Sequence, residues 1–356
     1  MTTRRAFLAS LLASGAAPRL GWAAAGNPAY LAAARTADGS FALHGLDKDG
    51  QSLFHIPLPA RGHAGAGHPT RAEAVGFARR PGTFALVIDC ATGALRHRLT
   101  PAEGRHFNGH GCYAMNGAWL LTAEQYSDTS AGAIGVWDVE AGYRRIGEYA
   151  SGGTGPHDLR LMPDGQTLAV ANGGIATDPS DRRKLNIATM RPNLSYLNLA
   201  GEVVDQIELA PDLHHNSIRH LALRSDGLLA FAMQWEGEEG AAPPLLGLHR
   251  RGAAPILASA PLADEIAMRG YAGSVAFSGD GTEVAITSPR GGRLHRFSAE
   301  GVFAGPVSRA DVCGLAPRAT GFFLSDGLGG LLALQGGHTR ALSQGALAWD
   351  NHIVWL

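Results

Sequence analysis

Four histidines recur at one phase of a repeated pattern and offer the clearest chemistry in the chain. His110, His157, His220 and His352 each stand at the start of a short apolar segment. Neutral imidazole is a ligand for first-row transition metals, and it also carries protons near neutral pH. If the repeated segments converge on a common centre, these four side chains converge with them.

A second set of polar side chains recurs seven residues after the glycine of each turn. Its members are Asp89, Glu124, Asn172, Gln234 and Ser288. In an antiparallel hairpin, the start of one strand and the end of the next lie at the same end. Both sets are therefore expected at one mouth of one channel, where Glu124 shares a repeat with a histidine.

These positions predict a metal site formed by His110, His157 and His220, with Glu124 as the fourth ligand. Iron is the first expectation for the ion, and copper or zinc are alternatives. The other polar residues are expected to bind a ligand or to support the metal ligands: His352, Gln234, Asn172, Asp89, Ser288, His68 and Arg219. His63 and His106, in connections near the same mouth, are secondary candidates. The competing interpretation is that each imidazole only hydrogen-bonds a neighbouring turn.

The repeat that must position these residues is a short apolar strand, a glycine-containing turn and a second apolar strand. Clear copies lie at 157–172, 220–234 and 274–288, each with Asp-Gly in its turn. Asp-Gly between apolar runs predicts a tight hairpin, because glycine readily adopts positive φ. Weaker copies are centred on Gly82, Gly117 and Gly321.

The repeat spacing predicts an all-β fold, a seven-bladed β-propeller. Gly82 and Gly117 are 35 residues apart, and Gly117 and Gly165 are 48 apart. Each of these lengths holds the four strands of a propeller blade. The six hairpins account for six blades and leave the seventh to the two ends of the chain.

The seventh blade is expected to close the ring. The C-terminal segment 352–356 has the pattern of a first strand, and 30–35, 41–44 and 52–56 have that of the other three. Pairing them would remove the exposed edges of an open sheet. One insertion, Gly173–Asn193, separates two strands of a blade, and a loop of this length is usually functional or disordered.

The first 25 residues differ from the rest of the chain. Arg4-Arg5 precede an apolar run, Phe7 to Ala17, and Ala23 to Ala25 supply small residues for cleavage. This pattern resembles a twin-arginine export signal, with an ordinary secretory signal as the alternative. It predicts a periplasmic protein with one domain, residues 26–356. The apolar run is too short to span a bilayer, so no membrane insertion is expected after cleavage.

The composition narrows the function classes. The 356 residues include 30 Lys and Arg against 31 Asp and Glu, a net charge of −1, which does not favour nucleic-acid binding. The three cysteines, Cys90, Cys112 and Cys313, form no C-x-x-C pair and have apolar neighbours, so buried, inert thiols are expected.

Several short motifs resemble the family called domain of unknown function 1513. They spread over most of the mature chain and are Phe77–Gly82, Gly155–His157, Val170–Thr177, Leu185-Asn186 with Thr189-Met190, Ser217–His220 and Thr287–Gly291. The resemblance implies a periplasmic propeller whose gene often lies beside genes for imelysin-like proteins and di-haem peroxidases. That context implies iron uptake and an imelysin-like partner, but it supplies no catalytic residue.

The leading hypothesis is therefore a non-enzymatic metal- or ligand-binding propeller that assists iron acquisition. An enzyme that uses the same channel, either an oxidoreductase or a metal-dependent hydrolase or lactonase, is one alternative. A docking platform for an imelysin-like or membrane partner is the other. Nothing in the sequence pairs a nucleophile with a base, so no catalytic residue is assigned.

Overall fold

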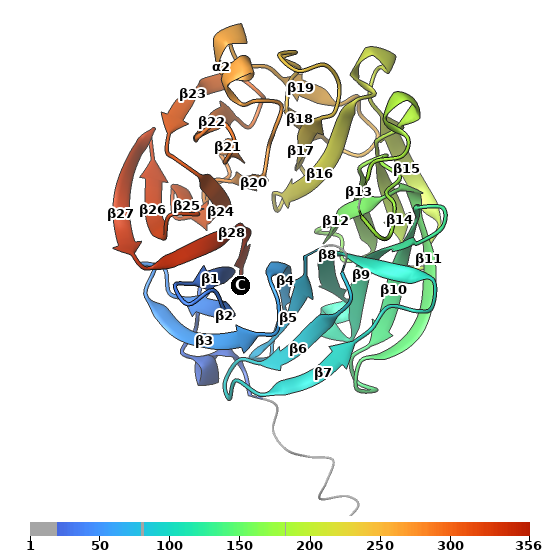
Figure 1. Ribbon diagram of the computed structural model, residues 1–356, viewed down its shortest axis with the longest axis vertical. Coiled ribbons are helices and arrows are strands. Elements are labelled where there is room, and N and C mark those ends of the chain that lie inside the picture. The colour runs from blue at the N-terminus through green and yellow to red at the C-terminus, as the bar shows by residue number, and fades with distance from the viewer. Residues whose placement is uncertain (1–19, 80–81, 182) are drawn as a thin grey trace, which may run out of the picture.

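The chain folds into seven four-stranded antiparallel sheets that stand around a common axis like the blades of a propeller (Figure 1). The computed structural model describes residues 20–79, 82–181 and 183–356. Within each blade the first strand lies nearest the axis, and we call it the inner strand. The predicted all-β, seven-bladed architecture is confirmed.

The strands follow one another outward from the axis in each blade. The blade shared by the two ends contains β28 (Leu347–Trp355), β1 (Tyr30–Thr36), β2 (Phe41–Leu46) and β3 (Ser52–Leu58). The second blade contains β4 (Gly62–Gly67), β5 (Glu73–Ala78), β6 (Ala85–Asp89) and β7 (Leu95–Leu99). The third contains β8 (Arg105–Ala114), β9 (Trp119–Tyr126), β10 (Ala131–Asp138) and β11 (Arg144–Thr154). The fourth contains β12 (Pro156–Leu161), β13 (Thr167–Asn172), β14 (Asn193–Asn198) and β15 (Val203–Glu208). The fifth blade contains β16 (Asn216–Leu223), β17 (Leu229–Trp235), β18 (Leu246–His249) and β19 (Ile256–Ala258). The sixth contains β20 (Ser274–Phe277), β21 (Glu283–Ser288), β22 (Arg293–Ser298) and β23 (Phe303–Ser308). The seventh contains β24 (Val312–Arg318), β25 (Gly321–Asp326), β26 (Gly330–Gln335) and β27 (His338–Gln344).

Helices are short in the described part of the chain. They are the 3-10 helices η1 (Trp22–Ala25), η2 (Met115–Gly117), η3 (Ile187–Thr189) and η4 (Pro211–Leu213), and the α-helix α2 (Leu262–Ala267). None of the described helices is long and apolar enough to cross a bilayer.

The Asp-Gly turns explain why the predicted hairpins form. Between β12 and β13, the carboxylate of Asp164 accepts hydrogen bonds from the backbone N–H groups of Gln166 and Thr167, at 2.9 and 2.8 Å. Gly165 adopts a φ of 67°, which disfavours any residue with a side chain. Asp226 and Asp280 stand before Gly227 and Gly281 in the equivalent turns of two further blades.

One predicted hairpin was assigned one strand out of place. Gly82 lies between β5 and β6, the second and third strands of its blade, and not between the first and second. The inner strand is β4, whose sequence Gly-His-Ala-Gly-Ala-Gly lacks the apolar alternation by which strands are usually identified. Small residues suit this position because a neighbour packs closely: a Cβ on Gly62 would lie 2.9 Å from that of Ala33.

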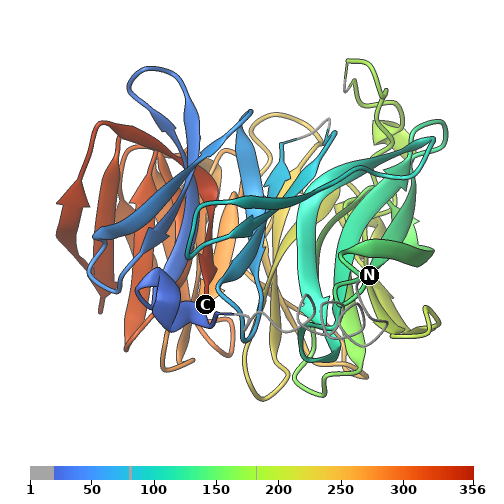
Figure 2. The same cartoon turned by 90° about the horizontal axis from the view of Figure 1, so that it is seen from below.

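The ring closes as predicted. β28 pairs with β1 in antiparallel register, with Tyr30 opposite Trp355 and Ala32 opposite Ile353. Figure 2 shows the C-terminus beside the blue N-terminal strands. The strand is longer than expected, because it begins at Leu347 rather than near residue 352.

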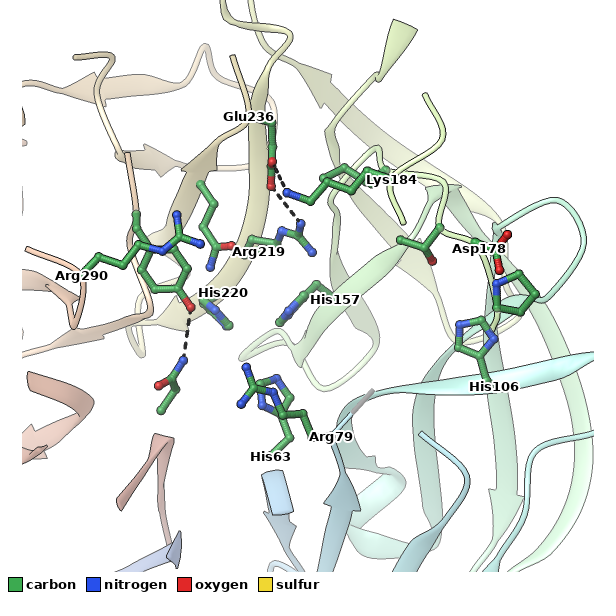
Figure 3. Close-up of a pocket in the computed structure, with 16 residues that line it drawn as sticks. His63, Arg79, His106, His157, Asp178, Lys184, Arg219, His220, Glu236 and Arg290 are labelled. Atoms are coloured by element: carbon green, nitrogen blue, oxygen red, sulfur yellow. Dashed lines mark hydrogen bonds and ion pairs between the residues drawn. The ribbon is translucent and has the colours of Figure 1, made fainter. Parts of the chain in front are cut away.

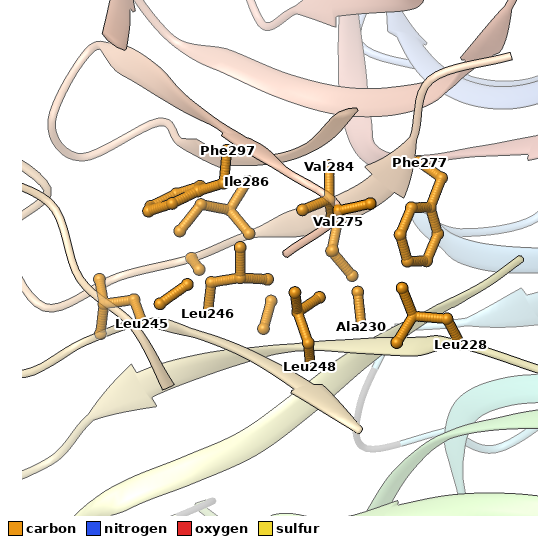
Figure 4. Close-up of a cluster of buried hydrophobic side chains, with 14 of the residues drawn as sticks. Leu228, Ala230, Leu245, Leu246, Leu248, Val275, Phe277, Val284, Ile286 and Phe297 are labelled. Carbon is orange, nitrogen blue, oxygen red and sulfur yellow. The ribbon is translucent and has the colours of Figure 1, made fainter. Parts of the chain in front are cut away.

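The apolar core lies between the blades. Buried side chains of the described residues form seven clusters, and each cluster joins two neighbouring blades. In Figure 4, Leu246 and Leu248 of one blade face Val275 and Ile286 of the next. Since each blade packs against a neighbour on both of its faces, each inner strand is held close to the two beside it.

Most of the predicted export signal, residues 1–19, lies outside the described residues. The part that follows packs against the protein: the Trp22 indole N–H donates to the carbonyl of His68 at 2.9 Å, and its ring contacts the core between two blades. Cleavage after Ala25, as predicted, would remove this contact.

Deleting residues 352–356 tests ring closure. We expect the deletion to lower the midpoint of thermal unfolding by about 10 °C or more, because it removes half of the β28–β1 pairing and the buried side chain of Ile353. The measurement is circular dichroism during heating. Trp355→Ala is the control, since this side chain is 65% exposed. His352→Ala separates loss of the strand from loss of one imidazole, and an unchanged midpoint in the deletion would contradict the closure.

Candidate metal centre

Five histidines from five inner strands meet at the centre of the ring. They are His63 on β4, His110 on β8, His157 on β12, His220 on β16 and His352 on β28, and we call them the histidine cluster. Three of them, His110, His157 and His220, are buried, and the other two are half-buried. The structure therefore brings together the three histidines expected to bind metal, and it adds two.

The imidazole rings are in mutual contact. The ring centroids of His63 and His352 are 4.6 Å apart, those of His157 and His220 are 4.7 Å apart, and those of His220 and His352 are 4.7 Å apart. His110 lies 4.8 Å from His352 and 4.9 Å from His157 by the same measure. Such a group is unusual in a core, because five polar rings replace apolar side chains there.

Strand irregularities aim the histidines inward. On β4, β8, β12 and β28 the pairing register with the next strand shifts across the cluster histidine, and on β16 it shifts between Ile218 and His220. A β-bulge turns one side chain out of the normal alternation and is common next to functional sites. The five bulges thus bring the imidazoles toward one point.

The ring nitrogens define two overlapping sets of three. Nitrogen atoms of His63, His110 and His352 lie within 4.8 Å of one another, and so do those of His110, His157 and His220. His110 belongs to both sets. Three imidazole nitrogens at this separation can close on one ion by small side-chain movements, to the 2.0–2.1 Å that zinc–nitrogen bonds require.

Two buried aspartates lie behind the cluster, and one of them is close enough to orient a cluster histidine. The Asp158 carboxylate lies 3.2 Å from Nδ1 of His110, accepts the N–H of Leu221 at 3.0 Å and contacts Arg160. Asp350 holds Arg61 at 2.6 Å and lies 3.9 Å from Nδ1 of His63. A carboxylate that accepts from one ring nitrogen fixes the tautomer and directs the other nitrogen to a metal.

Burial keeps three histidines of the cluster, His110, His220 and His352, uncharged near neutral pH. It lowers the pKa of His110 to about 4 against the opposing effect of Asp158, and it lowers that of His352 to about 3, with His63 adding to the decrease. The pKa of His220 is also well below its usual value, through burial and then its histidine neighbours. Protons therefore compete little for these nitrogens at pH 7.

The aspartates keep their charge. Burial would raise the pKa of Asp158, but Arg160, His110 and the Leu221 N–H hold it below its ordinary value. His63 and Arg61 likewise outweigh burial at Asp350 and lower its pKa.

Glu124, the expected fourth ligand, lies elsewhere. Its carboxylate accepts hydrogen bonds from Thr122 at 2.6 Å and from the Arg145 guanidinium at 2.7 Å, toward the outer strands of its blade. Gly135 on the neighbouring strand leaves room for it, since a Cβ there would collide with the carboxylate. The position of Glu124 along β9 was expected, but its side chain points away from the cluster.

The other predicted residues divide into three groups. Gln234 and Arg219 line a cavity above the cluster. Asn172 and Ser288 serve the fold: the Asn172 amide bonds to Asn193 and Ser195 within its blade, and the Ser288 hydroxyl donates to the carbonyl of Met268.

Asp89 and His68 lie at the opposite end of the blades. Asp89 ends the third strand of its blade and accepts hydrogen bonds from the N–H groups of the next turn. It was expected at the mouth because the prediction took this third strand for the second strand of the blade. His68 follows the end of β4, where its Nδ1 accepts the N–H groups of Thr70 and Arg71.

A cavity of about 230 Å³ opens above the cluster, with His63, His157 and His220 among its lining residues (Figure 3). We call it the mouth cavity. The long insertion Gly173–Asn193 supplies five of the lining residues, which gives this loop a place at the site. The charged lining residues are Arg79, Lys184, Arg219, Arg290, Asp178 and Glu236. His106 also lines it, as expected for a histidine near this mouth.

Sequence reasoning missed His63 as a main ligand and the two aspartates. A signal for His63 was available: His63, His110 and His157 are spaced by 47 residues each, which is one blade. Asp158 directly follows a cluster histidine and Asp350 precedes one by two residues, but no pattern in the chain marks that proximity as supporting a ligand.

The cysteines take no part in the site. Cys90, Cys112 and Cys313 are free thiols, and burial raises the pKa of each to about 12. A thiol that stays protonated is a poor nucleophile and a poor metal ligand, which agrees with the expected inert role.

Fold and cluster together define a seven-bladed β-propeller with an all-histidine centre. The chain belongs to the family described as a protein of unknown function, DUF1513, whose model matches residues 56–356. A solved structure of hydrazine synthase from Kuenenia stuttgartiensis is similar with a TM-score of 0.60 and 13% identity, and it covers 87% of this chain and 94% of that one. This likeness concerns the fold alone. The comparison with curated proteins gives no match.

Asp158→Asn tests the support of the cluster. The Asp158 carboxylate accepts hydrogen bonds on both oxygens, whereas an amide has one oxygen and one NH2 group, which would face either the His110 N–H or the Leu221 N–H. One of these donors would lose its acceptor, so we expect the free energy of unfolding to fall by about 1–3 kcal/mol. Denaturant unfolding measures this. Asp212→Asn, at an exposed carboxylate on η4, is the control and should cost less than about 1 kcal/mol. Equal losses in the two variants would show that Asp158 supports nothing beyond an ordinary surface aspartate.

Proposed function

We propose that this protein is a metal-binding β-propeller that holds one divalent transition-metal ion on the histidine cluster. The observation that carries the proposal is the convergence of five imidazoles, uncharged at pH 7 where their pKa is lowered, at the centre of a folded core. Nitrogen ligands without charge suit copper, zinc and ferrous iron.

The buried nitrogens support the proposal. Nε2 of His110, Nε2 of His352 and Nδ1 of His220 are buried and have no hydrogen-bond partner among the described residues. A buried polar atom left unpaired costs roughly 1–3 kcal/mol, so a fold would not retain three of them together without compensation. A metal ion on either set of three nitrogens would accept the lone pairs of two of them, His110 with His352 or His110 with His220.

The geometry favours one ion per chain. Both nitrogen sets include His110, and its Nδ1 is directed to Asp158, so only Nε2 is available to an ion. An ion on one set therefore removes a ligand from the other. The stoichiometry expected in solution is one.

The ligand set determines the expected order of metal affinity. With three imidazoles and no carboxylate in each nitrogen set, affinity should follow the usual order for nitrogen ligands, with copper above zinc and ferrous iron. A role in iron acquisition and an imelysin-like partner stay predictions from the family resemblance. A periplasmic location stays a prediction from Arg4-Arg5.

Titration of chelator-treated protein with Cu(II), Zn(II) and Fe(II) tests metal binding. We expect a stoichiometry of one ion and, for Cu(II) and Zn(II), a dissociation constant of about 1 µM or tighter. His110→Ala removes a ligand shared by both sets, and it should weaken binding by at least about tenfold. His157→Ala leaves the set of His63, His110 and His352 intact, and it should weaken binding less.

Two variants serve as controls. Glu124→Gln keeps the shape of a buried side chain that does not reach the cluster, and His338→Ala removes an exposed histidine on β27. Neither should change the affinity, and circular dichroism checks that each variant is folded. Binding that survives His110→Ala unchanged, or no binding at micromolar metal, would leave the cluster as a structural element and favour the docking-platform alternative.

A further inference from the structure

The side chains that line the mouth cavity carry a net positive charge. Four cationic and two anionic side chains line it, a net charge of +2. Glu236 ion-pairs with Lys184 and lies 3.7 Å from Arg219, so one carboxylate serves two cations. Asp178, the other acid, is paired with the exposed Arg183 at 3.6 Å.

Arg290 forms no ion pair with a carboxylate among the described residues. Its guanidinium lies 4.4 Å from the ring centroid of Tyr271. Figure 3 shows Arg290 and Arg79 entering the cavity from different sides, with the rings of His157 and His220 between them. A flat guanidinium held on an aromatic face keeps its donors free for a carboxylate, which it can bind with two parallel hydrogen bonds.

A metal ion on the cluster would increase the excess charge. The cluster imidazoles bring no negative charge, and the two aspartates behind them are each paired with an arginine, Arg160 or Arg61. A divalent ion attracts a nearby carboxylate, and this attraction is stronger in a partly buried site than in bulk water. An anion in the mouth cavity would therefore be stabilised by the lining cations and by the metal ion below it.

We propose that the mouth cavity binds a small carboxylate ligand, with one carboxylate on Arg290 and another directed to the metal ion on the histidine cluster. This inference rests on the proposed function for the ion, while the lining charge supports the carboxylate independently. The cavity volume of about 230 Å³ is that of roughly eight water molecules, at 30 Å³ each, which suits a compact dicarboxylate. The hydroxyl of Tyr271 and the amide of Asn351, which meet at 3.4 Å, offer further hydrogen bonds.

Calorimetric titration with malonate tests the inference, and malonamide is the neutral ligand of nearly equal shape. We expect malonate to bind metal-free protein, and to bind zinc-loaded protein about tenfold more tightly or better, while malonamide binds neither. Arg290→Gln should weaken malonate binding by about tenfold. Arg340→Gln, on the outer strand β27, should leave it unchanged.

The outcomes separate this inference from the proposed function. Zinc binding without malonate binding at about 20 mM would overturn the inference and leave the metal site standing. Malonate binding that depends on Arg290 in a protein that binds no zinc would support the carboxylate site and overturn the metal site. Equal binding of malonamide, or tighter binding of inorganic phosphate than of malonate, would overturn the assignment to a carboxylate.

Discussion

The face-to-face packing of neighbouring blades is the constraint on which the rest of the structure depends. Seven apolar clusters join the blades in a closed ring, and the pairing of β28 with β1 completes the blade that the two ends of the chain share. Because each blade is held from both sides, the seven inner strands are forced together around one axis. Side chains that leave those strands inward must then meet, however far apart they lie in the chain.

The histidine cluster uses this constraint. Bulges on the inner strands turn five imidazoles toward the centre, where apolar residues would pack at lower cost in desolvation. Burial keeps His110 and His352 neutral, and charged Asp158 behind His110 holds its ring in place. Polar groups that cost stability and are nevertheless oriented by further polar groups are typical of a functional site. The positively charged cavity above the cluster then gives a bound ion an accessible side.

The sequence predicted the architecture well because its signals are local. Asp-Gly turns such as Asp164-Gly165 are set by hydrogen bonds within a few residues, and they mark hairpins wherever they occur. The phase of His110, His157 and His220 within those hairpins was enough to predict that they converge. The strand β4 was missed for the opposite reason. Its glycines and alanines are required by close packing against a neighbouring strand, and they form no local pattern of apolar and polar residues. His63 was lost with it as a main ligand.

Side-chain direction was the part that the sequence could not supply. Glu124 lies near the end of β9, where expected, yet its side chain turns outward to Arg145 because Gly135 leaves space there. Asp158 and Asp350 support the cluster through contacts between blades, and these depend on how neighbouring blades dock. Spacing predicts where a residue stands along a strand, whereas packing decides what it touches.

Anomalous diffraction from crystals grown with zinc shows whether the histidine cluster binds a metal ion. We expect one anomalous peak per chain at the centre of the ring, about 2.0–2.1 Å from Nε2 of His110 and from nitrogens of two other cluster histidines. Zinc found only at exposed histidines such as His338, with no peak at the centre of the ring, would contradict it.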